Sequence, residues 1–190
     1  MPTTREDLPK ANRGPSAGPA NREALIAAAR HVFAEHGLSA PLSAVARRAG
    51  VGQGSLYRHF PDRVSLALAV FDENIADLDS LVSDPDGSVV DLFDRIADQA
   101  MASTALIDLI TSQRHDDRAV GLGRRLENII DTVLERDQKR DRIARTVVSA
   151  DILLSISMLA FLLARTDADQ QPGVAARARA IFRAAFRPAG

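Results

Sequence analysis

The sequence predicts an all-α protein with a small N-terminal domain and a larger C-terminal one. Apolar residues recur at spacings of three and four along most of the 190-residue chain. No stretch alternates with a period of two for long enough to predict a strand. The apolar fraction of 46% and the charged fraction of 26% are typical of a globular protein that buries a core.

The first 20 residues carry four prolines and two glycines and are almost without apolar side chains. A segment of this composition buries too little surface to offset the entropy lost on ordering. We therefore predict a flexible tail over residues 1–20.

Three helices are predicted in the N-terminal domain. The first begins at Asn21, a plausible N-cap, and ends at Gly37 as its C′ residue. A second short helix runs from about Leu42 to Ala49, and a third runs from Gln53 to Phe60. Gly50 lies in the short turn between them, and two short helices around such a turn form a helix-turn-helix.

Pro61 interrupts this pattern, and Asp62 is well placed to cap a long helix that extends to about Val82 and links the two domains. Residues 83–88, with Pro85 and Gly87, are predicted to form a loop. Further helices are predicted over residues 89–102, 104–115, 119–136, 149–165 and 173–186.

Several function classes are excluded by residue content. The chain has no cysteine, which removes disulfides, thiolate metal sites and cysteine nucleophiles and favours a reducing compartment. Its four histidines lack metal-site spacing, and we expect neither a metal nor a cofactor. Ser55, His59 and Asp62 crowd one short helix and form no credible catalytic triad, so we expect no enzyme.

The sequence also favours the cytoplasm. No apolar run follows a basic start at the N-terminus, so no signal peptide is visible. The longest apolar stretch, from Ile152 to Ala164, contains two serines and is shorter than the roughly 20 residues of a membrane span. We expect a cytoplasmic protein without a membrane partner.

Charge is divided unevenly along the chain although its net value is only −1. Residues 1–65 hold nine basic and five acidic side chains, a net charge of +4. Residues 66–190 hold fifteen basic and twenty acidic side chains, a net charge of −5. This asymmetry suggests that the N-terminal part meets a polyanion, and a chance fluctuation among solvated charges is the alternative. The basic residues of the tail suit either a minor-groove arm or a plain extension.

The third helix carries side chains that suit contact with DNA bases. The amide of Gln53 can pair with adenine through two hydrogen bonds, and Arg58 can reach guanine or a phosphate. Gly54 and Ser55 put little bulk between the backbone and the DNA, and the Ser55 hydroxyl can contact a base or a phosphate. The sequence therefore predicts a recognition helix that enters the major groove.

Tyr57 and His59 flank Arg58 and have donors suited to phosphate oxygens, whereas Leu56 and Phe60 are expected in the core. Phosphate contacts of this kind position a helix on the duplex without reading sequence.

The segment from Val51 to Arg63 resembles the recognition region of the TetR family of bacterial regulators. In that region the order is valine, a small residue, a variable one, glycine or proline, serine or threonine, leucine, tyrosine, a variable residue, histidine and phenylalanine, as in residues 51–60 here. The match covers roughly residues 19–78, with the helix-turn-helix at 41–60. The resemblance implies a homodimer, an N-terminal domain that binds DNA, and a helical C-terminal domain that binds a small effector.

The resemblance also implies roles for residues beside the recognition helix. Arg63 stands where the family has a lysine that contacts phosphate, and it keeps the charge. Pro41 departs from the family's threonine or serine cap, which leaves Ser39 or Ser43 to bond the first amides of the second helix. Ser43 and Arg47 are further candidates for DNA contact.

The C-terminal part, residues 66–190, is expected to provide the effector site and the dimer contact. The helix over 149–165 is apolar on more than one side, and together with 173–186 it resembles the family's dimerisation pair. The alternative is a monomer that covers both faces itself. The candidate effector-binding residues are Phe71, Ile75, Phe93, Met101, Arg114, Leu126, Ile130, Met158 and Phe161.

We therefore expect a DNA-binding domain at residues 21–65 and a regulator that represses transcription from a palindromic operator, associated with the nucleoid when bound. A small molecule would release it. The alternatives are a transcriptional activator and an architectural DNA binder without a ligand.

Overall fold

The computed structural model describes residues 18–102 and 117–188, and these residues form helices and loops without a strand, as predicted. The predicted helix over 104–115, with Arg114, lies outside the described residues, as do residues 1–17 of the predicted tail. The helices in chain order are α1 (Gly18–His36), α2 (Leu42–Arg48), α3 (Gln53–His59), α4 (Arg63–Ser83), α5 (Val89–Ala102), α7 (Asp117–Lys139), α8 (Ser149–Leu163) and α9 (Gln171–Ala185).

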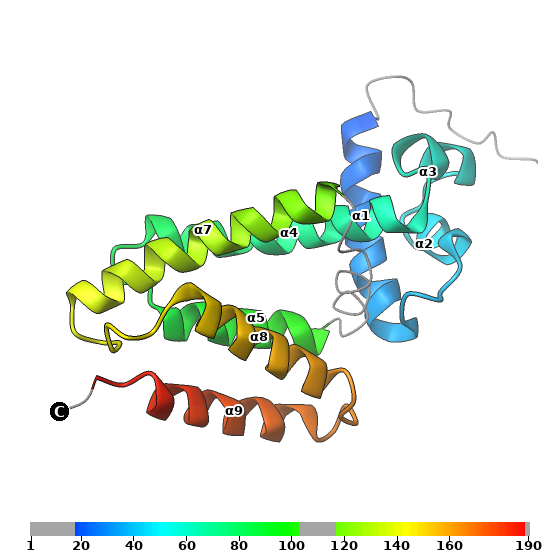
Figure 1. The fold of residues 1–190 in the computed structure, drawn as a ribbon. Helices are drawn as coiled ribbons and strands as arrows, with labels where there is room; N and C mark the ends of the chain where they lie inside the picture. The colour runs from blue at the N-terminus through cyan, green and yellow to red at the C-terminus, as the bar shows by residue number, and fades with distance from the viewer. Residues whose placement is uncertain (1–17, 103–116, 189–190) are drawn as a thin grey trace, which may run out of the picture.

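Two hydrophobic cores lie along the long helix α4. Helices α1, α2 and α3 gather around its first half at one end of the molecule (Figure 1). Their core contains Phe33, Val45 and Leu56 together with the α4 residues up to Val70. From Ile75 onward α4 contributes instead to the core of the C-terminal helices.

The C-terminal helices form a layered bundle. Helix α7 lies along α4, and α5 packs against α8 and α9 (Figure 1). The largest fully buried side chains of this core include Ile75, Leu92, Ile130 and Ile152. Helix α4 therefore connects the two cores as one continuous rod.

Helix α1 ends where the sequence predicts but begins earlier. Asn21 was predicted as the N-cap, and this is wrong, because α1 begins at Gly18 and contains Asn21. Pro19 fits the first helical turn, where its missing N–H costs nothing and its fixed φ suits the helix. At the other end Gly37 adopts a φ of +70°, and its N–H donates to the Phe33 carbonyl at 2.9 Å.

The cap predicted for α4 is confirmed. The Ser65 N–H donates to Oδ1 of Asp62 at 2.6 Å, and the Asp62 N–H lies 3.3 Å from the Ser65 hydroxyl. The two residues form a reciprocal capping box, which fixes the direction of α4 relative to α3.

Buried polar contacts from α7 hold the loop between α4 and α5. The Arg136 guanidinium donates to the carbonyls of Leu81 at 3.0 Å and Val82 at 2.7 Å, which are among the unpaired carbonyls at the end of α4. The buried Asp137 carboxylate accepts from the Val89 N–H at 2.9 Å, at the start of α5. These contacts satisfy both helix ends at once.

A second polar link joins α7 to α4. Arg125 donates to Asp72 at 2.8 Å and also to Asp79. The hydrogen bond to Asp79, followed by the charges of Asp79 and Asp72, raises the pKa of the Arg125 guanidinium against the opposing effect of desolvation. In the described part of the chain, no helix is both long and apolar enough to cross a lipid bilayer.

Candidate nucleic-acid interface

The turn between α2 and α3 is a Schellman motif that sets the angle between the two short helices. Gly50 adopts a φ of +66°, and its N–H donates to the Arg47 carbonyl at 3.2 Å. The Val51 N–H donates to the Ala46 carbonyl at 3.0 Å. Because a side chain at Gly50 would be strained at this φ, glycine is what allows α3 to start only three residues later.

Helix α3 is divided between a buried side and an exposed side. Leu56 and Phe60 are 1% and 3% exposed and belong to the N-terminal core. Residues Gly54 and Arg58, one helical turn apart, lie opposite them and are exposed. Burial of one side therefore presents the other to a partner.

The remaining predicted residues of α3 lie on its flanks. Gln53 and Tyr57 are exposed, and Ser55 and His59 are half-buried. Tyr57 is 53% exposed, which leaves much of a large ring and its hydroxyl without cover from the protein. The structure thus brings six predicted residues onto one short helix, and four of them are exposed.

The guanidinium of Arg58 is folded back onto its own helix. Its Nε donates to the Gly54 carbonyl at 3.2 Å. The Nη groups have no partner in the described residues, so the side chain is positioned over Gly54 with its outer donors available.

The predicted cap of α2 is wrong. The residue directly before the helix is Pro41, with φ −67° and ψ 136°, and no side chain bonds the first amides. Neither Ser39 nor Ser43 occupies the cap position from which a side chain reaches those groups. Ser43 and Arg47 are both exposed on α2, as their proposed contact with DNA requires.

Arg63 is placed differently from a freely extended phosphate ligand. The side chain is half-buried, and its Nη1 donates to the carbonyls of Leu38 and Ala40 in the loop between α1 and α2. Leu38 and Ala40 precede Arg63 by 25 and 23 positions. No local sequence pattern could therefore reveal that they orient this side chain.

Two arginines near this surface make contacts that the sequence did not indicate. The Arg22 guanidinium lies 5.5 Å from the centre of the Phe60 ring, a cation–π contact between α1 and the end of α3. Arg48 pairs with Glu35 of α1 at 3.4 Å. Neither contact leaves a signal in the sequence, because each joins different helices.

The candidate effector-binding residues are separated by the fold. Those on α4, α5 and α7 pack in or against the C-terminal core, namely Phe71, Ile75, Phe93, Met101, Leu126 and Ile130. Met158 and Phe161 are each 59% exposed on α8, and their assignment to an internal cavity is wrong. The apolar stripe that contains them faces outward, because the stripe with Ile152 and Leu159 is the one packed on the core.

Helices α8 and α9 expose large apolar side chains, which we call the exposed apolar patch. Its members are 49–60% exposed, four on α8 and one on α9: Leu154, Met158, Phe161, Leu162 and Ile181. Large exposed apolar areas mark interaction surfaces. In the described residues no group of three or more His, Asp or Glu side chains is arranged to hold a metal ion.

Comparison with known proteins agrees with this geometry. Residues 25–70 match the family model described as bacterial regulatory proteins, tetR family. That range comprises most of α1, the whole of α2 and α3, and the start of α4. Comparison with curated proteins gives no match.

Solved structures match over nearly the whole chain. A TetR transcriptional regulator from Streptomyces coelicolor is 26% identical and superposes with a TM-score of 0.69, covering 89% of this chain and 99% of its own. A TetR transcription regulatory protein from Mycobacterium vanbaalenii has 24% identity and a TM-score of 0.62 over 90% and 98% of the two chains. Residues 25–70 thus carry the DNA-binding region of the tetR family by the model that they match, and the fold of the chain is similar to that of solved TetR regulators.

Proposed function

We propose that this protein is a sequence-specific DNA-binding regulator, most simply a repressor that a small-molecule effector releases from its operator. The observation that carries the proposal is the division of α3, where Leu56 and Phe60 are buried while Gln53, Gly54 and Arg58 are exposed. A short helix exposed in this way after a tight turn is the arrangement by which a helix-turn-helix enters the major groove.

The proposed contacts fall into two groups. Gln53 and Arg58 read base edges, with Gly54 and Ser55 permitting close approach. Tyr57 and His59 bind phosphates, and so do Arg63, Ser43 and Arg47.

Sequence selection tests this assignment. DNA selected from a random pool by the full chain is expected to contain a palindromic site, and binding to it is expected to fall steeply with salt. Arg58→Ala or Gln53→Ala should relax base preference, whereas Tyr57→Phe or Arg63→Ala should weaken all sites alike. The reverse pattern would overturn the assignment.

Competition with random DNA separates this function from an architectural binder. A specific regulator bound to the selected site resists competition by random DNA. An architectural protein is displaced equally by random DNA and by unlabelled DNA of the selected site. An activator, the other alternative, would bind the same site and raise transcription from the adjacent promoter.

The exposed apolar patch on α8 and α9 supports a homodimer formed through residues 149–165 and 173–186. A two-fold arrangement would pair the patch with its copy and set two recognition helices in successive major grooves, about 34–36 Å apart. Sedimentation should give a dimer of the 20.4 kDa chain. A monomer at micromolar concentration would refute this proposal.

We propose that residues 21–65 bind DNA and that residues 66–190 hold the dimer contact and the effector site. Residues 18–20, which composition assigned to the tail, are the first residues of α1. A protein with these roles works in the cytoplasm, on the nucleoid when bound, and needs no catalytic step. An effector would act by favouring a dimer whose recognition helices have a different separation.

A further inference from the structure

A cavity of about 220 Å³ lies at the far end of the C-terminal bundle, away from α3. It is formed between α5, α9 and the loop that joins α7 to α8, which contributes Ile143. Of the described residues expected to bind an effector, only Phe93 lines it. The cavity is therefore a separate candidate site.

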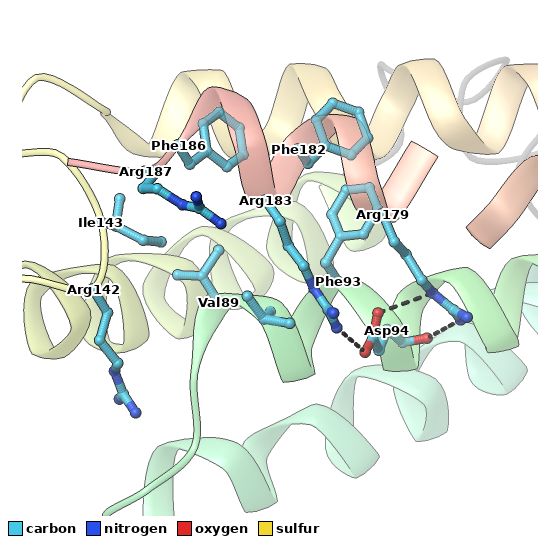
Figure 2. Close-up of a pocket in the computed structure, with 11 residues that line it drawn as sticks. Val89, Phe93, Asp94, Arg142, Ile143, Arg179, Phe182, Arg183, Phe186 and Arg187 are labelled. Atoms are coloured by element: carbon cyan, nitrogen blue, oxygen red, sulfur yellow. Dashed lines mark hydrogen bonds and ion pairs between the residues drawn. The ribbon is translucent and has the colours of Figure 1, made fainter. Parts of the chain in front are cut away.

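The apolar side of the cavity is aromatic. The Phe93 and Phe182 rings have centroids 4.5 Å apart and are tilted by 58°, and the Phe182 and Phe186 rings are stacked with centroids 5.9 Å apart. Figure 2 shows these three rings together with Arg179, Arg183 and Arg187. Such a surface favours a flat aromatic ligand, which can add a further ring in an offset or edge-to-face contact.

The polar side of the cavity is strongly basic. Arg179 and Arg183 are one turn apart on α9 and lie on one face, and Arg187 follows two residues after the helix ends at Ala185. All three line the cavity, and among the described residues the one acidic side chain that lines it is Asp94 of α5. Since like charges placed this close repel, this wall has an excess of positive charge that an anion would relieve.

Asp94 does not satisfy the three arginines equally. Arg179 Nε lies 2.9 Å from Asp94 Oδ1, at ion-pair distance without hydrogen-bond geometry, and its Nη2 donates to Asp98 at 2.7 Å. Arg183 reaches Asp94 through one nitrogen at 3.3 Å, as the dashed lines in Figure 2 mark. Arg187 has no ion pair with any acidic side chain in the described residues. Donors of Arg183 and Arg187 thus remain open.

We propose that this cavity binds a small aromatic carboxylate. The ring lies against Phe93, Phe182 and Phe186, and the carboxylate accepts from Arg183 and Arg187, whose planar guanidinium groups match its geometry. The cavity is smaller than the roughly 300–1,000 Å³ of pockets for drug-sized ligands, so a ligand of one or two fused rings is the size that fits.

Binding at this site stands independently of DNA binding, whereas a role for the ligand as an effector rests on the proposed function. Helix α9 is the connection between the two. Its basic face lines the cavity, and Ile181 on its opposite side belongs to the exposed apolar patch. A ligand that draws Arg183 and Arg187 inward would therefore act on a helix of the proposed dimer contact.

Calorimetric titration of the full chain with 2-naphthoate tests the site, with the neutral isostere 2-naphthamide as the matched ligand. Naphthoate is expected to bind at least about tenfold more tightly than the amide, a difference of about 1.4 kcal/mol. The double variant Arg183→Gln/Arg187→Gln should lose at least that factor for naphthoate and leave the weak amide binding unchanged. Both arginines are exposed, so the fold should persist, which circular dichroism checks.

The control is Arg124→Gln/Arg145→Gln, which removes the same charge from exposed positions outside the cavity and should bind naphthoate like the wild type. The proposal would be overturned if the acid and the amide bound with equal affinity, or if no binding were seen at millimolar naphthoate. It would also be overturned if the Arg183→Gln/Arg187→Gln variant bound naphthoate like the wild type, or if the control variant lost as much affinity as that variant. Titration of the protein with the selected DNA, without ligand, distinguishes failure of this inference from failure of the proposed function. If DNA binds and naphthoate does not, this inference alone is refuted. If naphthoate binds and the DNA does not, the proposed function alone is refuted.

Discussion

Replacing Gly54 by alanine should strengthen the fold and weaken DNA binding. Gly54 is in the first turn of α3, and a Cβ built on it meets no heavy atom within 4 Å. The fold therefore has room for a methyl group. Alanine stabilises a helix relative to glycine by about 0.5–1 kcal/mol, because glycine loses more backbone entropy on folding.

The same methyl group would stand on the side of α3 opposite the buried Leu56, where the proposed contact brings DNA bases close. Losing about 1.4 kcal/mol of contact at each half-site would weaken binding about tenfold, and up to about a hundredfold for a dimer on a palindrome. Stability and affinity would thus change in opposite directions, which a simple defect in folding cannot produce.

Thermal unfolding and fluorescence anisotropy with the selected DNA measure the two effects. For a chain of this size the stabilisation corresponds to a rise in Tm of about 1–4 °C at fixed protein concentration. Gly121→Ala is the matched control, because Gly121 is exposed inside α7 and its Cβ also meets nothing within 4 Å. It should raise Tm and leave affinity unchanged. Wild-type affinity in Gly54→Ala would refute close approach of DNA at this position.

Three further substitutions test other parts of the structure. Asp137→Leu removes the acceptor of the Val89 N–H and should cost about 2–4 kcal/mol of unfolding free energy in urea, whereas Asp137→Asn keeps an acceptor and should cost less. Gly87→Ala would place a Cβ 2.5 Å from the Leu81 carbonyl oxygen and should cost about 1–3 kcal/mol, so an unchanged urea midpoint would contradict this close contact. Phe161→Glu, on the exposed patch, should raise the dimer dissociation constant at least about tenfold in sedimentation, and an unchanged dimer would place the contact elsewhere.

Features that depend on neighbours in the chain were predictable from the sequence. Glycines 37 and 50 end their helices with positive φ, and Asp62 caps α4, because these signals act over three to five residues. The helix-turn-helix was predictable for the same reason, since its apolar spacing decides which side of α3 is buried. The two wrong cap predictions, at Asn21 and in α2, also have local causes. Pro19 lies in the first turn of α1, and Pro41 directly precedes α2.

The tertiary structure alone decided which of two equally apolar stripes of α8 faces outward, because periodicity marks both stripes and only packing against α5 and α7 selects one. It also decided that Arg63 meets two carbonyls more than 20 residues away. The basic cavity is the clearest case. Asp94 lies 85 residues before Arg179, and only the packing of α5 against α9 brings Arg179 and Arg183 to Asp94 in the wall of a site. Such contacts join distant segments, and no local pattern in the sequence records them.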